Sequence, residues 1–146
     1  MSIGFKRKLD RKQMRLASAG LMAYAITIVV DWIVGPYLNP DAIPTFPFFQ
    51  FYLVAALAIM VFFSFRIAWG AAFLLFSAYA FNEISSLIAI WNRDDAWTML
   101  YDGETLAWYV VCYRIIRLFI DLGVLWFLFQ SSYKALRAES ADEWEK

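Results

Sequence analysis

The sequence predicts an all-α fold: a polytopic membrane protein with an antiparallel bundle of four transmembrane helices and a short helical cytoplasmic C-terminal extension. Apolar residues make up 62% of the 146 residues and aromatic residues 20%, whereas soluble globular chains are about 45–50% apolar. The apolar residues also gather in four long segments. A soluble domain of this length could not hide so much apolar surface, because small folds leave a large share of their residues exposed.

Each apolar segment approaches or exceeds the roughly 17–25 helical residues that cross the hydrocarbon core of a bilayer. The predicted spans are residues 16–34, 48–65, 67–91 and 105–129. The connection 35–47 holds all four prolines, which prevent one helix from continuing from the first span into the second. Only a short turn near residues 64–66 separates the second and third spans, which predicts a tight antiparallel hairpin.

These spans divide the chain into three parts. Residues 1–15 form a basic cytoplasmic segment, residues 16–129 the transmembrane domain, and residues 130–146 a cytoplasmic tail. The apolar stretch that follows the basic segment is too long for a cleaved signal sequence and lacks an A-x-A-like site, so we expect it to remain as the first span. The tail is rich in helix-forming residues, which predicts that the fourth helix continues into it.

Basic residues predict the orientation of the bundle. The N-terminal segment, the turn with Arg66 and the C-terminal tail with Lys134 and Arg137 are basic, whereas the two longer loops hold a single basic residue, Arg93. The positive-inside rule then places both termini in the cytoplasm and the two longer loops outside. We therefore expect a protein of the plasma (inner) membrane.

The sequence lacks the residues that most enzymes and redox proteins need. It contains no histidine, which excludes His-ligated metals and haem as well as Ser–His or Cys–His catalysis. The single cysteine, Cys112, excludes an internal disulfide and lies in an apolar run where we expect it to be buried. No phosphate-binding or nucleophile-elbow motif is present, and the acidic loop 92–104 lacks the ligand spacing of a calcium site. We expect no enzyme activity, no cofactor and no metal.

Charged residues lie inside the predicted spans, where each costs at least about 2.5–3.5 kcal/mol near the helix centre and is normally paired or hydrated. Helical spacing puts Arg114, Arg117 and Asp121 on one stripe of the fourth span. One face of the first span carries a stripe of small and polar residues, namely Gly20, Tyr24, Thr27 and Asp31. The candidate intramembrane polar cluster consists of Tyr24, Asp31, Asn82, Glu83, Arg114, Arg117 and Asp121.

Depths estimated from the rise of ~1.5 Å per helical residue indicate how the cluster pairs. Glu83 lies about 12 Å and Arg114 about 13 Å below the outer ends of their spans, so antiparallel neighbours bring the two side by side. Arg117 and Asp121 can pair within the fourth helix, and Asp31 is within upward reach of an arginine. The three acids exceed the two arginines by one, so one acid is expected to stay hydrated or to hold a proton.

The cluster allows more than one interpretation. It can be a structural polar core that fixes helix register, because interhelical hydrogen bonds hold membrane helices together. It can also be an ion or proton path, because ionisable residues inside a membrane often mark one. Binding of a lipid headgroup or a small ligand by the arginines is a third reading. The structural reading is preferred.

We therefore expect a non-catalytic integral membrane subunit that packs against partners in a larger membrane protein assembly, in a structural or accessory role. Its expected partners are the lipid bilayer and other membrane subunits or further copies of the chain, and not nucleic acid. One alternative is a small oligomeric ion or proton channel or transporter that uses the Arg–acid cluster. Another is a holin-like viral membrane protein, which is less favoured because lesion-forming helices need no paired central arginines.

Overall fold

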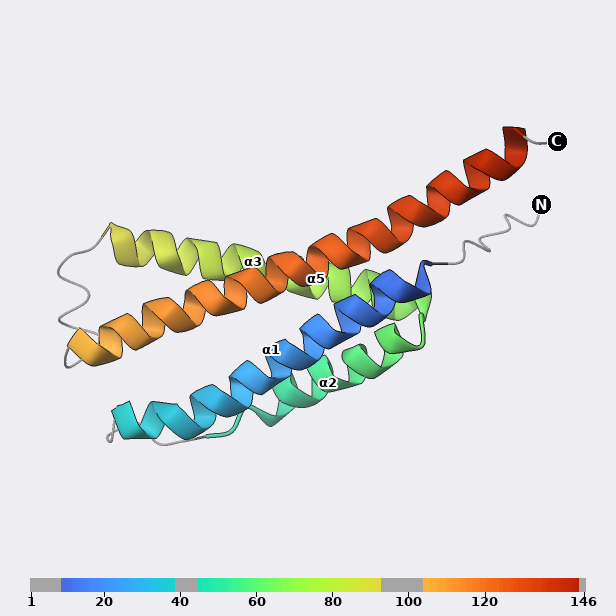
Figure 1. The fold of residues 1–146 in the computed structure, drawn as a ribbon. Helices are drawn as coiled ribbons and strands as arrows, with labels where there is room; N and C mark the ends of the chain where they lie inside the picture. The colour runs from blue at the N-terminus through green and yellow to red at the C-terminus, as the bar shows by residue number, and fades with distance from the viewer. Residues whose placement is uncertain (1–8, 39–44, 93–103, 145–146) are drawn as a thin grey trace.

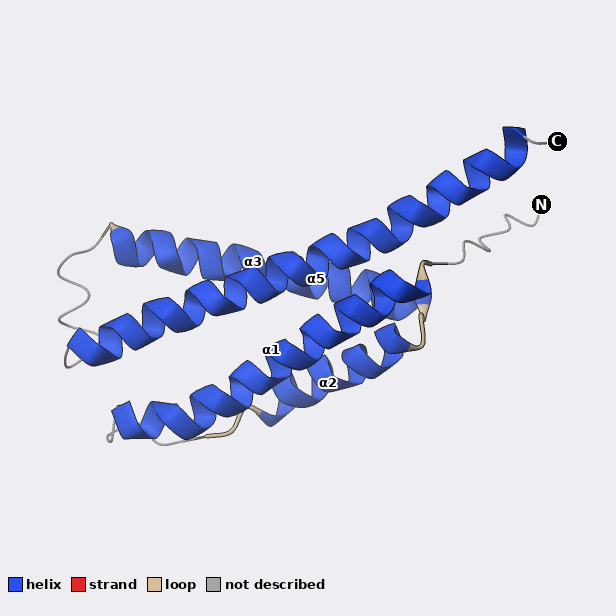
Figure 2. Ribbon diagram, in the orientation of Figure 1, coloured by secondary structure: helices blue, strands red, loops and turns tan. Residues whose placement is uncertain are grey.

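Within the residues that the structure describes, the predicted all-α fold with four helices is confirmed. The computed structural model describes residues 9–38, 45–92 and 104–144, apart from the side chains of residues 104–107, 139 and 141–144. Within these ranges every regular element is a helix (Figure 2). The helices are α1 (Arg11–Leu38), α2 (Phe48–Phe62), α3 (Arg66–Trp91) and α5 (Glu104–Trp144). Most of the acidic loop and the whole of residues 1–8 lie outside the described residues.

The helices run alternately up and down (Figure 1). α1 and α5 form the most extensive contact, α2 packs against α1, α3 packs against α5, and the contact between α2 and α3 is smaller. At one end, which we name the turn end, α1 begins beside the short α2–α3 turn. At the other, which we name the loop end, α1 and α3 finish and α5 begins.

Helix α1 is longer than the predicted span at both of its ends. Its first turn is capped by Asp10, whose carboxylate accepts a hydrogen bond from the Gln13 amide at 3.0 Å, as an N-cap residue does. The Asp10 amide also donates to the Ser131 carbonyl of α5 at 3.3 Å, which joins the two helices at the turn end. At the loop end, Pro36 lies inside the last turn, and α1 ends two residues later at Leu38.

The predicted hairpin between the second and third helices is present, although α2 ends at Phe62 rather than near residue 65. The cause is Ser64, which adopts a left-handed backbone with φ 61°. The Ser64 amide donates to the Val61 carbonyl at 2.8 Å and the Phe65 amide to the Met60 carbonyl at 3.1 Å. This pair of bonds is a Schellman C-cap, which ends a helix and satisfies its last carbonyl groups.

The apolar core fills mainly the half of the bundle nearest the turn end. Its buried members include Met14, Leu21, Val61, Phe76, Val124 and Leu128. α1 and α5 approach closely at Gly20, where a Cβ atom would lie 2.5 Å from Val124 Cγ2. Polar side chains add cross-links: Ser18 Oγ donates to the Ala58 carbonyl at 2.8 Å, and Trp69 Nε1 to the Leu128 carbonyl at 2.9 Å.

Two of the described helices, α1 and α3, are long and apolar enough to cross a membrane. α2 has 15 residues, fewer than the roughly 17–25 that a membrane-spanning helix uses. The apolar part of α5 is interrupted by Arg114, Arg117 and Asp121. The two long helices are weak evidence for membrane association, and the four-span bundle stays a prediction.

Candidate functional site

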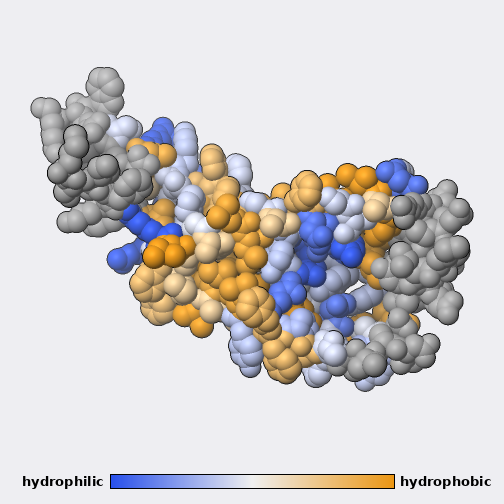
Figure 3. All heavy atoms as spheres, turned by 180° about the vertical axis from the view of Figure 1, so that it is seen from behind, coloured by the Kyte–Doolittle hydropathy of each residue, from blue (hydrophilic) through white to orange (hydrophobic). Residues whose placement is uncertain are grey.

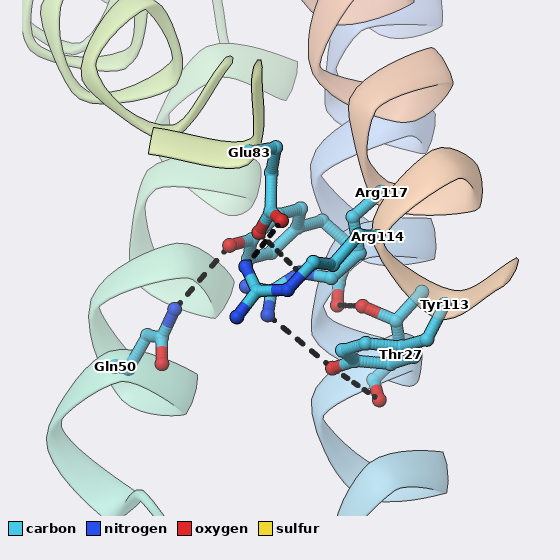
Figure 4. A network of polar contacts seen from close by, with 7 residues as sticks. Thr27, Gln50, Glu83, Tyr113, Arg114 and Arg117 are labelled. Carbon is cyan, nitrogen blue, oxygen red and sulfur yellow. Dashed lines mark hydrogen bonds and ion pairs between the residues drawn. The ribbon is translucent and has the colours of Figure 1, made fainter. Parts of the chain in front are cut away.

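All four helices contribute to a group of polar side chains near the middle of the bundle (Figure 4). We name this group the central cluster. It consists of Tyr24 from α1, Gln50 from α2, Glu83 from α3, and Tyr113, Arg114 and Arg117 from α5, which contact one another. Asp121 of α5 also belongs to it, because it interacts electrostatically with Arg117 and Glu83. It adjoins the apolar core on the side of the loop end, because Tyr24 packs edge-on against Phe76 with ring centroids 5.1 Å apart.

Glu83 is the acid that both arginines share. Its Oε2 lies 2.9 Å from Arg114 Nη1, and its Oε1 lies 3.7 Å from Arg117 Nε. The Glu83 side chain is only 4% exposed, against 28% for Arg114 and 14% for Arg117. The proximity of Glu83 and Arg114 expected from their depths is confirmed. Since charge-assisted bonds are the stronger ones, this contact is a firm link between α3 and α5.

Arg117 is held between two tyrosine rings. Its guanidinium carbon lies 4.3 Å from the centre of the Tyr24 ring and 5.2 Å from that of Tyr113. Its Nη1 also donates to the Tyr113 hydroxyl at 3.4 Å. An arginine placed over aromatic faces is attracted by the ring quadrupole, and the attraction grows as water is removed. These contacts fix the side chain across the α1–α5 interface.

Asp121 is the exception in the cluster, because it is fully buried and neither of its carboxylate oxygens has a hydrogen-bond partner among the described residues. The expected Arg117–Asp121 pair does not form at hydrogen-bonding distance among the described residues, although the two charges still attract each other. Side chains on a helix tilt toward its N-terminus, and Arg117 donates instead to Tyr113, one turn earlier in the chain. Tyr24 does not hydrogen-bond to Asp121 either; its hydroxyl accepts a hydrogen bond from Gln50 Nε2 at 3.3 Å.

A second set of contacts joins α1 and α5 nearer the loop end. Tyr109 donates from its hydroxyl to Asp31 Oδ1 at 3.1 Å, and the Tyr113 hydroxyl donates to the Thr27 carbonyl at 3.2 Å. Asp31 therefore pairs with a tyrosine and not with an arginine, contrary to expectation. This changes the charge balance, because the central cluster itself holds two arginines against Glu83 and Asp121, and the surplus acid lies outside it.

Two polar residues point away from the cluster. Asn82 is exposed, although its neighbour Glu83 is buried. Adjacent residues on a helix are about 100° apart, so both cannot face the same partner. Cys112 is also exposed on α5, so the prediction that it is buried within the bundle is wrong.

Gln50, Tyr109 and Tyr113 also belong to the polar network, although they are not among the residues predicted for it. A signal for the two tyrosines was present, since Tyr109, Tyr113, Arg117 and Asp121 follow one another at four-residue spacing, which places them on one helix face. Gln50 could not be found in this way, because it is a single polar residue among apolar ones near the start of α2, and the sequence does not show which way α2 is rotated.

The described cluster contains paired charges and aromatic rings, and the described residues include no group of three carboxylate or thiol side chains that could hold a metal ion. What this arrangement does chemically is to join helices through charge-assisted and cation–π contacts. The chain matches no family model, no curated protein and no solved structure. A functional assignment therefore has to rest on the geometry of the chain.

Proposed function

We propose that the chain is a non-catalytic integral membrane subunit, which crosses the membrane with its four helices and packs against partner proteins in a larger assembly. The observation that carries the proposal is the C-terminal part of α5, a helical segment that leaves the bundle and has no packing partner within the described chain. The central cluster has a structural role in this proposal: it joins all four helices inside the membrane.

The outward faces of the helices support the membrane placement. Large apolar side chains are exposed on all four helices, including Ile26, Phe49, Ile67, Leu74, Phe81, Phe119 and Trp126. Hydrophobic side chains cover much of the middle of one face, and hydrophilic ones gather between them (Figure 3). An apolar surface of this extent is rare on monomeric soluble proteins, and lipid is the solvent that suits it.

The charges of the central cluster agree with such a placement. Glu83 lies about 12 Å from the end of α3 at Trp91 and about 26 Å from its start at Arg66, so it is well inside a hydrocarbon core that is about 30 Å thick. Charged residues at that depth normally face the bundle interior and pair with one another. Glu83 and the two arginines do both.

The length of α5 supports a partner outside the membrane. Its 41 residues extend over about 60 Å, twice the thickness of the hydrocarbon core. Ser131 is the last buried residue among the side chains that the structure describes, and beyond it Tyr133, Lys134, Leu136 and Arg137 are exposed. This part of α5 projects past the other helices (Figure 1). A helix that packs against nothing gains little stability beyond its propensity, so a docked partner would explain the extension.

The distribution of basic residues supports a cytoplasmic turn end in the plasma (inner) membrane. Arg11, Lys12 and Arg15 open α1, and Arg66 opens α3 at the same end of the bundle. Lys134 follows on α5 three residues after Ser131, whose carbonyl accepts a hydrogen bond from the Asp10 amide at that end. Under the positive-inside rule this end, and with it both termini, faces the cytoplasm.

A second candidate function, a proton-conducting channel or transporter, is favoured by one observation. Asp121 is a buried carboxyl group with no hydrogen-bond partner among the described residues, and ionisable residues inside membranes often mark proton paths. The fixed position of Arg117 between two rings favours the structural role, because a conducting path needs groups that can exchange partners.

Isolation from the native membrane in mild detergent tests the proposed function. We expect the chain to come out with another membrane protein in fixed stoichiometry. Replacing the exposed apolar residues of the extension, in the double variant Tyr133→Ser with Leu136→Ser, should release that partner, whereas the exposed neighbour Ala138→Ser should retain it. Isolation of the chain with no other protein would contradict the proposal.

A further inference from the structure

The outward face of α3 carries a stripe of small and polar residues that the central cluster does not use. Its members, which we name the α3 stripe, are Ala78, Asn82, Ser85, Ala89 and Asn92, and all of them are exposed. Their spacing alternates between four and three residues, which keeps them on one narrow line along a helix. The buried residues Phe76, Ala80 and Glu83 lie on the opposite side of α3.

Asn82 is a residue of this stripe whose side chain lacks a hydrogen-bond partner among the described residues. It lies about 14 Å from the end of α3 at Trp91, close to the middle of the proposed membrane. Its carboxamide makes no hydrogen bond within the described residues, and it is exposed where lipid would otherwise surround it. An amide in hydrocarbon without a hydrogen-bond partner is unfavourable, and asparagine therefore promotes the association of membrane helices.

We propose that α3 of one copy pairs with α3 of a second copy through the α3 stripe, with the two Asn82 carboxamides hydrogen-bonded to each other. This inference rests on the membrane placement in the proposed function, and it names one of the partners. The resulting interface is two-fold symmetric, with the same surface on both copies.

Depth and hydrogen-bonding chemistry favour a second copy over a different protein. Two copies inserted in the same orientation hold Asn82 at the same depth, and a carboxamide is its own complement because it has both a donor and an acceptor. Alternating four- and three-residue spacing is the pattern of helices that cross at a small angle, which keeps equal positions face to face. A different protein would have to present a polar group at that depth by its own sequence.

The size of the neighbouring side chains suits close packing of the two helices. Ala78, Ser85 and Ala89 are small, and small residues let membrane helices approach. Phe81 and Ile88 are 74% and 55% exposed and lie along one edge of the stripe, where they can cover that side of the contact. The face that α3 turns toward α5 and α2 is separate, so the pairing leaves the bundle intact.

Disulfide cross-linking in liposomes tests the geometry. Cys112→Ser first removes the single native cysteine, and Ser85→Cys then places a thiol on the stripe with little change in size. The matched control is Ile84→Cys, an exposed neighbour at almost the same depth but about 100° around the helix. Under mild oxidation the Ser85→Cys protein should form mainly cross-linked dimers, and the Ile84→Cys protein should stay mainly monomeric.

Association measured in the same liposomes tests the role of the amide. Asn82→Leu should raise the dimer dissociation constant about 3- to 20-fold, the range expected for interhelical hydrogen bonds. Asn82→Gln keeps the amide and should retain most of the affinity, and Ile84→Leu should leave it unchanged. Because Asn82 and Ile84 are both exposed, helix content measured by circular dichroism should be equal in all three variants.

The outcomes separate this inference from the proposed function. A chain that stays monomeric in liposomes, that cross-links better through position 84, or that associates equally well with leucine at position 82 overturns the inference. Such a chain can still be isolated with a different membrane protein, and the proposed function then stands. If the chain instead associates with itself through the α3 stripe and no second protein is isolated with it from the native membrane, the inference stands and the proposed function is overturned.

Discussion

The close approach of α1 and α5 at Gly20 predicts a position where adding one methyl group destabilises the bundle. An alanine Cβ at this site would lie 2.5 Å from Val124 Cγ2, where ordinary contacts between carbon atoms are about 3.5–4.0 Å. Valine is stiff at χ1, so the two helices have to move apart. Overpacking of this kind costs about 1–3 kcal/mol, and the better helix propensity of alanine offsets roughly 0.5–1 kcal/mol.

We therefore expect Gly20→Ala to lower the free energy of unfolding by about 1–2 kcal/mol. Two other helical glycines are matched controls, because a Cβ atom at Gly70 or Gly123 would meet nothing within 4 Å. Gly70→Ala and Gly123→Ala should be neutral, or stabilising by up to about 1 kcal/mol. The measurement is denaturant unfolding in mild detergent, followed by circular dichroism.

A compensating substitution makes the test specific to this contact. Val124→Ala removes the methyl group that the new Cβ would strike, so Gly20→Ala should be much less harmful in that background than in the wild type. Energies of residues in contact are not additive, and the size of the deviation measures their interaction. If Gly20→Ala unfolds like Gly123→Ala, the α1–α5 packing described above is wrong.

Three further predictions concern the turn, the cluster and the topology. Ser64→Gly should raise the free energy of unfolding by about 1 kcal/mol, because glycine adopts the left-handed backbone at φ 61° without penalty; a destabilised variant would speak against the Schellman turn. Glu83→Leu should lower that free energy by about 3–5 kcal/mol, as loss of one partner of a buried ion pair does. Asp121→Leu should cost less, because the Asp121 carboxylate accepts no hydrogen bond among the described residues, and equal losses in the two variants would refute that ranking. Reporter fusions at Met1 and after Lys146 should both be cytoplasmic, whereas tags in residues 36–47 and 92–104 should be external. An external C-terminus would show that one of the four predicted spans does not cross the membrane.

The elements of the fold were largely predictable because they depend on composition and on local signals. Long apolar runs and the proline-rich connection predicted four helices. Counting residues back from the end of α3 and forward from the start of α5 was enough to predict that Glu83 and Arg114 lie at the same depth. The end of α2 was not predictable to the residue, because it depends on a left-handed serine, and nothing in the sequence requires Ser64 to adopt that conformation.

The partners within the candidate site were harder to predict, because they depend on side-chain direction and on helix rotation. Arg117 has an acid four residues later in the chain, yet it extends toward the N-terminus of α5, where Tyr113 and the carboxylate of Glu83 lie. Asn82 and Glu83 are adjacent, and the sequence does not show which of the two faces the bundle. That rotation decides whether Asn82 belongs to the cluster or to an outer surface.

The measurement that tests the central claim most directly is proton flux into liposomes that contain the purified protein. In the structural account, Glu83 joins α3 to α5 and turns over no proton, so a pH gradient should drive no flux above that of empty liposomes. Glu83→Gln keeps an oxygen acceptor for Arg114 and should leave expression and assembly close to wild type. A robust flux in the wild type that disappears in Glu83→Gln would contradict the structural account and favour a proton path.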